Sequence, residues 1–232
     1  MLPPMSEQIV LITGAKGGLG KSVTKAFLDG GAVVAGSSRS ITDADFPHPH
    51  FLAVPADLLD SAQAAQLVET VLARWGRIDV LVHLAGGFTA GAIHETDDAV
   101  WDGMMNANLR AAFHMLRAII PGMRKARRGR IVAISSRLAV ETAPGVAAYA
   151  ASKAALVSLI RSAAMENRDF GITANTILPG TIDTAANRSW GSPEERAKWV
   201  SPERIADLAV FLASDAAAEI SGAAIPIYGA AV

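Results

Sequence analysis

The chain has 232 residues, of which 51% are hydrophobic and 19% are charged, and its formal net charge is −1. This length can bury a sizeable core, and the balanced charge gives no electrostatic reason to expect a nucleic acid as partner. The lack of cysteine excludes disulfides and thiol catalysis, and the histidines have no metal-ligand spacing. With no signal peptide and no apolar run of ~18 residues, we expect a cytoplasmic protein with one domain over residues 1–232 and no membrane span.

The first predicted element is a buried strand over residues 8–13, which ends in a glycine-rich turn. The turn, Gly14-Ala-Lys-Gly-Gly-Leu-Gly20, leads into a helix over residues 21–29 with apolar side chains at helical spacing. A strand, a glycine turn and a helix make a phosphate cradle. The glycines let the backbone approach a pyrophosphate, and the free N–H groups at the helix start attract its negative charge.

The same turn also fits a degenerate P-loop, in which Lys21 would reach phosphates and Ser22 a magnesium ion. The stretch Lys16-Gly-Gly-Leu-Gly-Lys-Ser22 is similar to the variant P-loop of the chromosome-partitioning ATPases. Those enzymes also need acidic residues at the ends of the next strands, whereas the strand predicted over 32–38 ends in serine. On this stretch alone, an ATPase and a dinucleotide-binding protein both stay open.

The rest of the chain alternates predicted strands and helices, after a loop over 36–50 with little room for a helix. Further strands are expected at 51–55, 79–84, 130–135, 172–178 and 224–228, and helices at 61–75, 97–123, 148–168 and 202–212. This alternation predicts an α/β fold with a doubly wound parallel sheet of about seven strands and helices on both faces. Ligands then bind at the carboxyl ends of the strands, which are followed here by Gly14, Asp57, Gly86, Ser136 and Pro179.

A tyrosine and a lysine stand four residues apart in the helix predicted over 148–168. Tyr149 and Lys153 therefore lie on one face of the helix, one turn apart. The cation favours the phenolate and is expected to lower the pKa of the tyrosine from about 10 toward the working pH. Ser136 follows a predicted strand and could hydrogen-bond the substrate oxygen that the tyrosine protonates or deprotonates. A Tyr–Lys pair at this spacing is often only a surface pair, so its meaning depends on the rest of the chain.

Over nearly its whole length, the chain resembles the short-chain dehydrogenase/reductase superfamily. Thr13-Gly-x-x-x-Gly18-x-Gly20 is similar to the cofactor motif of that family, and Pro179-Gly180 to its nicotinamide-covering segment. The match to its catalytic tetrad, in order and spacing, is Asn108, Ser136, Tyr149 and Lys153. The resemblance implies a Rossmann-type fold and an NAD(P)-dependent oxidoreductase that transfers hydride between nicotinamide and a carbonyl or alcohol. It makes the ATPase interpretation remote.

The resemblance also implies a role for each matched residue. Tyr149 would be the general acid in reduction and the base in oxidation, and Lys153 would lower its pKa and hydrogen-bond the nicotinamide ribose. Ser136 would hold the substrate oxygen. Asn108 would keep a kink in its helix and a water that links Lys153 to solvent. The residues implied to contact the cofactor are Gly14, Lys16, Gly18, Leu19, Gly20, Ser38, Arg39, Asp57, Leu58, Ala85, Gly86, Pro179, Gly180, Ile182 and Thr184.

Two departures from the family pattern matter. His83-Leu84-Ala85-Gly86 stands where the family usually has Asn-Asn-Ala-Gly, so a side-chain tie between neighbouring strands must be replaced or lost, and we expect His83 to be a packed core residue. Members that prefer NAD place an aspartate where this chain has Ser38, which Arg39 follows. A serine, a guanidinium and the nearby Lys16 can bind a 2′-phosphate, so NADP(H) is favoured over NAD(H). Alternatively, Arg39 only stacks on adenine, which would suit either cofactor.

Two other functions stay open. The short 36–50 loop and the brief connection after Thr184 are similar to quinoid dihydropteridine reductase, which implies a pterin reductase as one alternative. A non-catalytic cofactor-binding regulator is the other. The resemblance further implies a small carbonyl, alcohol or pterin substrate and a homodimer or homotetramer that pairs through helices 97–123 and 148–168. The substrate itself is not readable, because its loops offer little chemistry beyond Phe88, His94 and Trp190.

Overall fold

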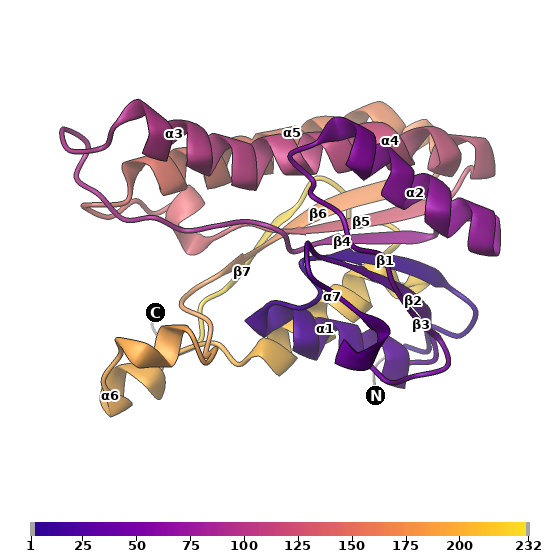
Figure 1. Ribbon diagram of the computed structural model, residues 1–232, viewed down its shortest axis with the longest axis horizontal. Coiled ribbons are helices and arrows are strands. Elements are labelled where there is room, and N and C mark those ends of the chain that lie inside the picture. Colours follow the sequence, from indigo (N-terminus) through magenta and orange to yellow (C-terminus); the bar gives the residue numbers. More distant parts are fainter. Residues whose placement is uncertain (1–2, 231–232) are drawn as a thin grey trace.

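The computed structural model describes residues 3–230 and has a parallel sheet of seven strands covered by helices on both faces (Figure 1). The strands are β1 (Ile9–Thr13), β2 (Val33–Ser37), β3 (Phe51–Ala53), β4 (Val80–His83), β5 (Gly129–Ile134), β6 (Ile172–Pro179) and β7 (Ala224–Ile227). Their order is β3-β2-β1-β4-β5-β6-β7, and every neighbouring pair is parallel. The order reverses between β1 and β4, which opens a ligand crevice beyond their carboxyl ends. The predicted doubly wound, Rossmann-type sheet is confirmed.

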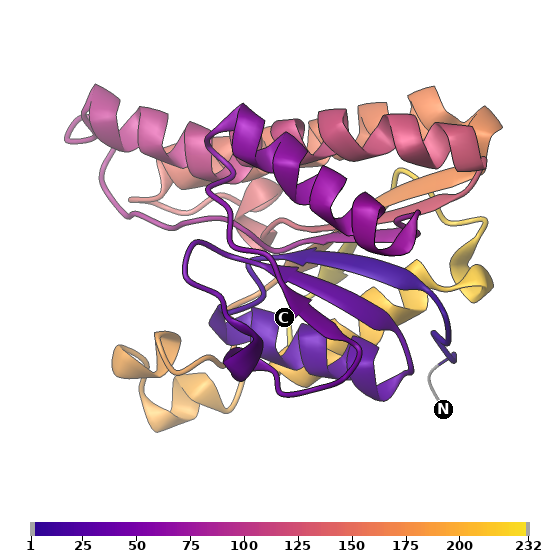
Figure 2. The same ribbon diagram turned by 45° about the vertical axis from the view of Figure 1, so that its right-hand side comes forward.

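The helices form one layer on each side of the sheet (Figures 1 and 2). One layer consists of α1 (Gly18–Asp29) and α7 (Pro202–Ala213), and the other of α2 (Ser61–Trp75), α3 (Asp98–Met105), α4 (Ala111–Ala126) and α5 (Ala147–Asn167). The short α6 (Pro193–Arg196) lies away from the sheet. Single 3-10 turns occupy Asp43–Asp45, Arg137–Ala139, Arg168–Phe170, Asn187–Ser189 and Asp215–Ala217. Within residues 3–230, no helix is both long and apolar enough to cross a membrane.

Alternate side chains of each central strand enter two separate cores. Leu11 of β1 packs in the core beneath α2, α4 and α5, whereas its neighbours Val10 and Ile12 pack in the core beneath α1 and α7. Both faces of the strand are thus buried, which explains why its sequence is continuously apolar rather than alternating. Each such side chain stabilises the fold by roughly 1.5–3 kcal/mol. The carboxyl ends of the strands are thereby held on a rigid base.

The long helix on the α5 side differs from its prediction. It runs from α3 through a π-helical turn (Asn106–Arg110) into α4, contains Pro121, and ends at Ala126 rather than at the predicted residue 123. An internal proline costs about 3 kcal/mol. Burial of Met123 against Gly129 of β5 and hydrogen bonds from Arg124 to the end of α5 offset this cost. Packing therefore carries the helix one turn further, to Ala126.

Candidate active site

The glycine turn after β1 is too tight for side chains. A Cβ on Gly20 would lie 2.2 Å from the carbonyl oxygen of Gly14, and one on Gly14 would lie 2.9 Å from the nitrogen of Ala85. A Cβ on Gly18 would come within 3.0 Å of the Thr184 side chain. Leu19, also expected at the cofactor, packs partly buried against the core on the α1 side. The turn thus brings together expected cofactor residues from three distant segments at the start of α1, where backbone N–H groups favour a pyrophosphate.

A cavity of about 350 Å³ opens beside this turn. It collects most of the residues expected at the adenosine end of a dinucleotide, namely Gly14, Ser38, Arg39, Asp57, Leu58, Ala85 and Gly86. The buried hydroxyls of Ser37 and Ser38 have no hydrogen-bond partner within the described residues. Because a buried polar atom without a partner costs free energy, these hydroxyls are suited to meet a polar ligand. The residues present therefore fit a dinucleotide.

Lys16 is the one residue expected near Ser38 and Arg39 that does not line this cavity. Its ammonium group lies 3.0 Å from the Asp45 carboxylate and donates a 2.8 Å hydrogen bond to the carbonyl of Ser40. The pKa of Asp45 is lowered below its usual value. The main cause is a hydrogen bond from the Thr42 backbone, and the second is a hydrogen bond from Lys16. The Lys16 side chain is thus bound to the short loop between β2 and β3.

A second cavity, of about 430 Å³, surrounds the tyrosine. Its lining residues come from five segments: Phe88, Ser135, Ser136, Arg137, Leu138, Tyr149, Pro179, Gly180, Thr181, Ile182, Asn187 and Trp190. Tyr149 is in the first turn of α5, and Ser136 follows β5. The two side chains are hydrogen-bonded to each other. The Phe88 ring meets the tyrosine edge-on, with 4.9 Å between centroids. The predicted serine–tyrosine pair therefore shares one cavity with the segment after β6.

Lys153 follows Tyr149 by one helical turn of α5 and is not among the residues that line this cavity. It is buried, donates a 2.9 Å hydrogen bond to the carbonyl of Ile134, and its Nζ is 5.9 Å from the centre of the tyrosine ring. The expectation that the tyrosine pKa lies below its ordinary value is wrong. Burial raises the pKa of Tyr149, and the hydrogen bond with Ser136 offsets this only in part. Burial also lowers the pKa of Lys153 itself, to about 8, because the charged amine has lost its water.

Asn108 lies in the π-helical turn, which agrees with its predicted place at a helix irregularity. Its side chain accepts a hydrogen bond from the Gly87 nitrogen and donates to the Gly87 carbonyl, each 3.0 Å long, and donates to the Ser152 hydroxyl, also 3.0 Å. A Cβ on Gly86 would lie 2.5 Å from the Asn108 amide oxygen and 3.3 Å from Lys153 Nζ. Asn108 thus fastens the segment after β4 to α5. Its contact with a water stays a prediction.

His83 replaces the missing asparagine tie. Its Nδ1 is 3.0 Å from the Thr13 hydroxyl, and the two residues are register partners on β4 and β1. The ring is buried, and its Nε2 has no partner among the described residues. Burial, and next the charge of Lys153, lower the pKa of His83 to about 3, so the ring is neutral. The prediction of a packed core histidine is confirmed, and the side-chain tie between the strands is kept.

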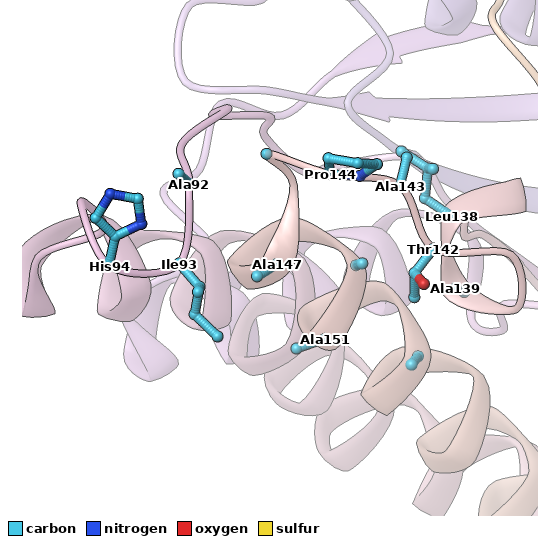
Figure 3. A pocket seen from close by; sticks show the side chains of 13 residues that line it. Ala92, Ile93, His94, Leu138, Ala139, Thr142, Ala143, Pro144, Ala147 and Ala151 are labelled. Carbon is cyan, nitrogen blue, oxygen red and sulfur yellow. The ribbon is translucent and has the colours of Figure 1, made fainter.

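A third cavity, of about 620 Å³, lies outside the tyrosine site (Figure 3). The loop around Ile93 and His94 and the segment from Leu138 to Gly145 surround it, and alanines of α5 form its floor. Leu138 lines both this cavity and that of Tyr149. Of the side chains expected to line the substrate pocket, Phe88 and Trp190 are therefore with the tyrosine, whereas His94 is not.

Sequence reasoning missed Arg137 and Tyr228. Arg137 lines the cavity of Tyr149, and its guanidinium carbon lies 4.7 Å from the centre of the Tyr228 ring. The position of Arg137 directly after Ser136 could have drawn attention to it. Tyr228 gave no such signal, because only the fold brings β7 beside the segment after β5.

The fold is that of a Rossmann-like α/β protein, with cavities at the carboxyl ends of its parallel strands. A family model described as short chain dehydrogenase matches residues 8–195, and the chain belongs to this family of oxidoreductases. The ATPase interpretation has no further support. The Ser22 hydroxyl, which would have met a magnesium ion, donates a 3.0 Å hydrogen bond to Glu203 of α7 instead.

Curated relatives match along nearly the whole chain. A 3-oxoacyl-[acyl-carrier-protein] reductase, FabG, of Thermotoga maritima is 31% identical over 242 residues, covering 97% of this chain and 98% of the relative. A 2,3-dihydro-2,3-dihydroxybenzoate dehydrogenase of Escherichia coli is 34% identical over 230 residues, covering 91% and 92%. The crystal structure of gox2181 superimposes with a TM-score of 0.90 at 27% identity, covering 97% of this chain and 95% of that one.

Proposed function

We propose that the protein is an NAD(P)-dependent oxidoreductase that interconverts a carbonyl group and an alcohol, with Tyr149 as the general acid and base. The observation that carries this proposal is the shared cavity, which is lined by the hydrogen-bonded pair Tyr149 and Ser136 and by the segment after β6. The family match from residue 8 to 195 includes the whole tetrad and supports the same function.

The chain's own groups supply placement and the proton. When bound, the nicotinamide supplies or accepts the hydride. Ser136 would donate a hydrogen bond to the substrate oxygen and so hold it beside the tyrosine hydroxyl. Tyr149 would then give its proton to that oxygen in reduction and take it back in oxidation. Lys153, a cation below pH about 8, would stabilise the phenolate that remains after proton transfer.

Tyr149→Phe tests this mechanism. The substitution keeps the ring and removes only the hydroxyl that carries the proton, so we expect the carbonyl reductase rate to fall at least ~100-fold, the usual range for loss of a general acid. Binding of NADPH, followed by its fluorescence, should persist because the cofactor cavity is intact. An unchanged rate would refute the catalytic role of the tyrosine and favour a non-catalytic cofactor-binding regulator.

We further propose a preference for NADP(H). Ser38, whose hydroxyl has no partner within residues 3–230, and the exposed Arg39 lie together at the cavity beside the glycine turn, and neither carries the negative charge that would repel a 2′-phosphate. Comparing kcat/KM for NADPH and NADH in wild type and Arg39→Ala tests this preference. We expect wild type to favour NADPH and Arg39→Ala to lose at least ten-fold of that preference. Equal loss with both cofactors would mean that Arg39 only stacks on the adenine.

A pterin reductase is a second candidate, which one feature of the tyrosine cavity favours. Phe88 and Trp190 line the cavity and are both largely exposed, as suits a flat ring held between them. The curated relatives are named for a 3-oxoacyl-[acyl-carrier-protein] and for a 2,3-dihydro-2,3-dihydroxybenzoate, so open-chain and cyclic substrates are both candidates. Turnover of quinoid dihydropterin, compared with that of simple ketones, distinguishes the two functions.

We also propose a homo-oligomer that pairs through the helices on the α5 side. Trp101 of α3 and Phe113 of α4 are large apolar side chains exposed on that layer, which favours their burial in an interface. Light scattering after size-exclusion chromatography measures the mass. A monomer at micromolar concentration would refute this pairing.

A further inference from the structure

We propose that Arg137 selects substrates with a carboxylate group, so that the protein acts on cyclic carbonyl or alcohol acids. This inference rests on the proposed function and names the substrate class of the same cavity. Among the described residues that line the cavity of Tyr149, Arg137 is the only one with a formal charge. Its neighbours there are apolar or neutral polar groups, so the formal charge of this lining comes from Arg137.

The backbone fixes Arg137 next to the reacting group. The Ser136 hydroxyl accepts a 3.2 Å hydrogen bond from the nitrogen of Leu138 and so caps the 3-10 turn that begins at Arg137. The serine that would hold the substrate oxygen and the guanidinium therefore belong to one short rigid turn. A substrate with its carbonyl at Ser136 would have its far end within the reach of a long side chain that starts one residue away.

The side chain is also held in place. Its guanidinium stacks on the ring of Tyr228, with 4.7 Å to the ring centre, and its Nε donates a 2.7 Å hydrogen bond to the carboxylate of Glu141. A stacked guanidinium that already holds one carboxylate is oriented for recognising carboxylates, since this group matches their geometry. Glu141 thus marks the kind of partner that the guanidinium binds.

Glu141 is a replaceable partner. Its side chain is 48% exposed and that of Arg137 is 33% exposed, and an ion pair of this exposure is weak because water screens it. A substrate carboxylate inside the less solvated cavity would compete with Glu141 for the guanidinium. Removing the charge of Glu141 should therefore strengthen the binding of an acidic substrate, whereas a purely structural Arg137–Glu141 pair would give the opposite result or none.

The aromatic walls define the rest of the substrate. Phe88 and Trp190 are 60% and 62% exposed, although both line this cavity. Such side chains bind flat or cyclic groups on their faces and exclude water from them. A ring would lie between these two aromatic side chains. Its oxygen would bind at Ser136 and Tyr149, and its carboxylate would bind at Arg137.

The test uses matched probes, 3- and 4-oxocyclohexanecarboxylate and their neutral methyl esters, so that charge and spacing vary separately. For the full-length protein with reduced cofactor, we measure the ratio of kcat/KM for acid over ester. We expect wild type to prefer at least one acid, Arg137→Gln to reduce the ratio at least ten-fold, and Glu141→Gln to increase it about two- to five-fold. Arg161→Gln removes an exposed guanidinium of α5 outside the cavity and should leave the ratio unchanged.

Calorimetric binding of the same probes separates this inference from the proposed function. If no probe is turned over, yet an acid binds wild type at least ten-fold more tightly than Arg137→Gln, carbonyl reduction fails and carboxylate recognition stands. If the probes are reduced but the acid-to-ester ratio is equal in wild type and Arg137→Gln, the function stands and the inference is overturned. Equal binding of acids and esters to wild type also overturns it. Melting temperatures within a few degrees for all variants show that the ratios report binding rather than unfolding.

Discussion

Replacing His83 with asparagine is expected to reduce the sensitivity of folding to acid. In the folded protein, burial and the charge of Lys153 lower the pKa of His83 from 6.5 to about 3, whereas the unfolded chain keeps the ordinary value. Between these two pH values the unfolded state binds more protons than the folded state. Stability is therefore complete above pH 6.5 and is lost as the pH falls from 6.5 toward 3. Asparagine can still reach the Thr13 hydroxyl, but it cannot take up a proton.

The magnitude follows from the size of the shift. Each pH unit below 6.5 costs about 1.4 kcal/mol while the folded ring stays neutral. At pH 5, the loss due to His83 is thus about 2 kcal/mol relative to pH 7.5, and its limit near pH 3 is roughly 5 kcal/mol. Because domains are stable by only about 5–15 kcal/mol, this one ring is a large fraction of the total.

Urea unfolding followed by circular dichroism at pH 7.5 and pH 5 measures this effect. We expect wild type to lose about 2 kcal/mol more between the two pH values than His83→Asn. His94→Asn, which replaces an exposed histidine, should lose as much as wild type. If His83→Asn and wild type lost the same free energy, the ring would be protonated or hydrated in the folded protein, and the reasoning from burial would be refuted.

Three further predictions concern the site. At pH 7, Lys153→Met should abolish reductase activity yet raise the free energy of unfolding in urea by about 1–2 kcal/mol. The reason is that burial lowers the pKa of Lys153 from 10.5 to about 8, so the buried ammonium destabilises the folded state at pH 7. This destabilisation should fade as the pH rises from 8 toward 10.5. Gly20→Ala should destabilise the chain by at least about 2 kcal/mol in the same assay, since its Cβ meets backbone oxygens, whereas Gly103→Ala, with open space around its Cβ, should not destabilise it. Asp45→Asn should release Lys16 toward a 2′-phosphate and lower KM for NADPH two- to five-fold without lowering KM for NADH; an equal change with both cofactors contradicts this reading.

The features that could be predicted from the sequence depend on local spacing. The glycine turn is one such feature, because it is formed by consecutive residues and because Gly20 has no room for a side chain. The placement of Tyr149 and Lys153 is another, since four residues make one helical turn. The alternation of apolar strands and amphipathic helices gave the layered sheet for the same reason.

The features that escaped prediction depend on contacts between distant segments. The direction of the Tyr149 pKa shift follows from burial that only the fold produces, and this burial outweighs the hydrogen bond with Ser136. The ion pair that turns Lys16 away from the adenosine cavity needs Asp45, a residue of a loop with no readable structure in the sequence. Helix α4 continues past Pro121 because its far turn packs on β5 and α5, which local propensity cannot reveal.

The glycine turn and the residues proposed to transfer the proton are joined by buried polar side chains rather than by apolar packing alone. His83 connects the strand before the glycine turn to β4, and Asn108 connects the segment after β4 to α5, which carries Tyr149 and Lys153. Burial disfavours the charged forms of both His83 and Lys153, so this region stores unfavourable free energy at the pH values where either is protonated. An apolar core would be more stable here, but it would not hold an ammonium beneath the tyrosine. The low pKa of His83 keeps a second positive charge away from that ammonium, which is why a histidine can stand where the family has an asparagine.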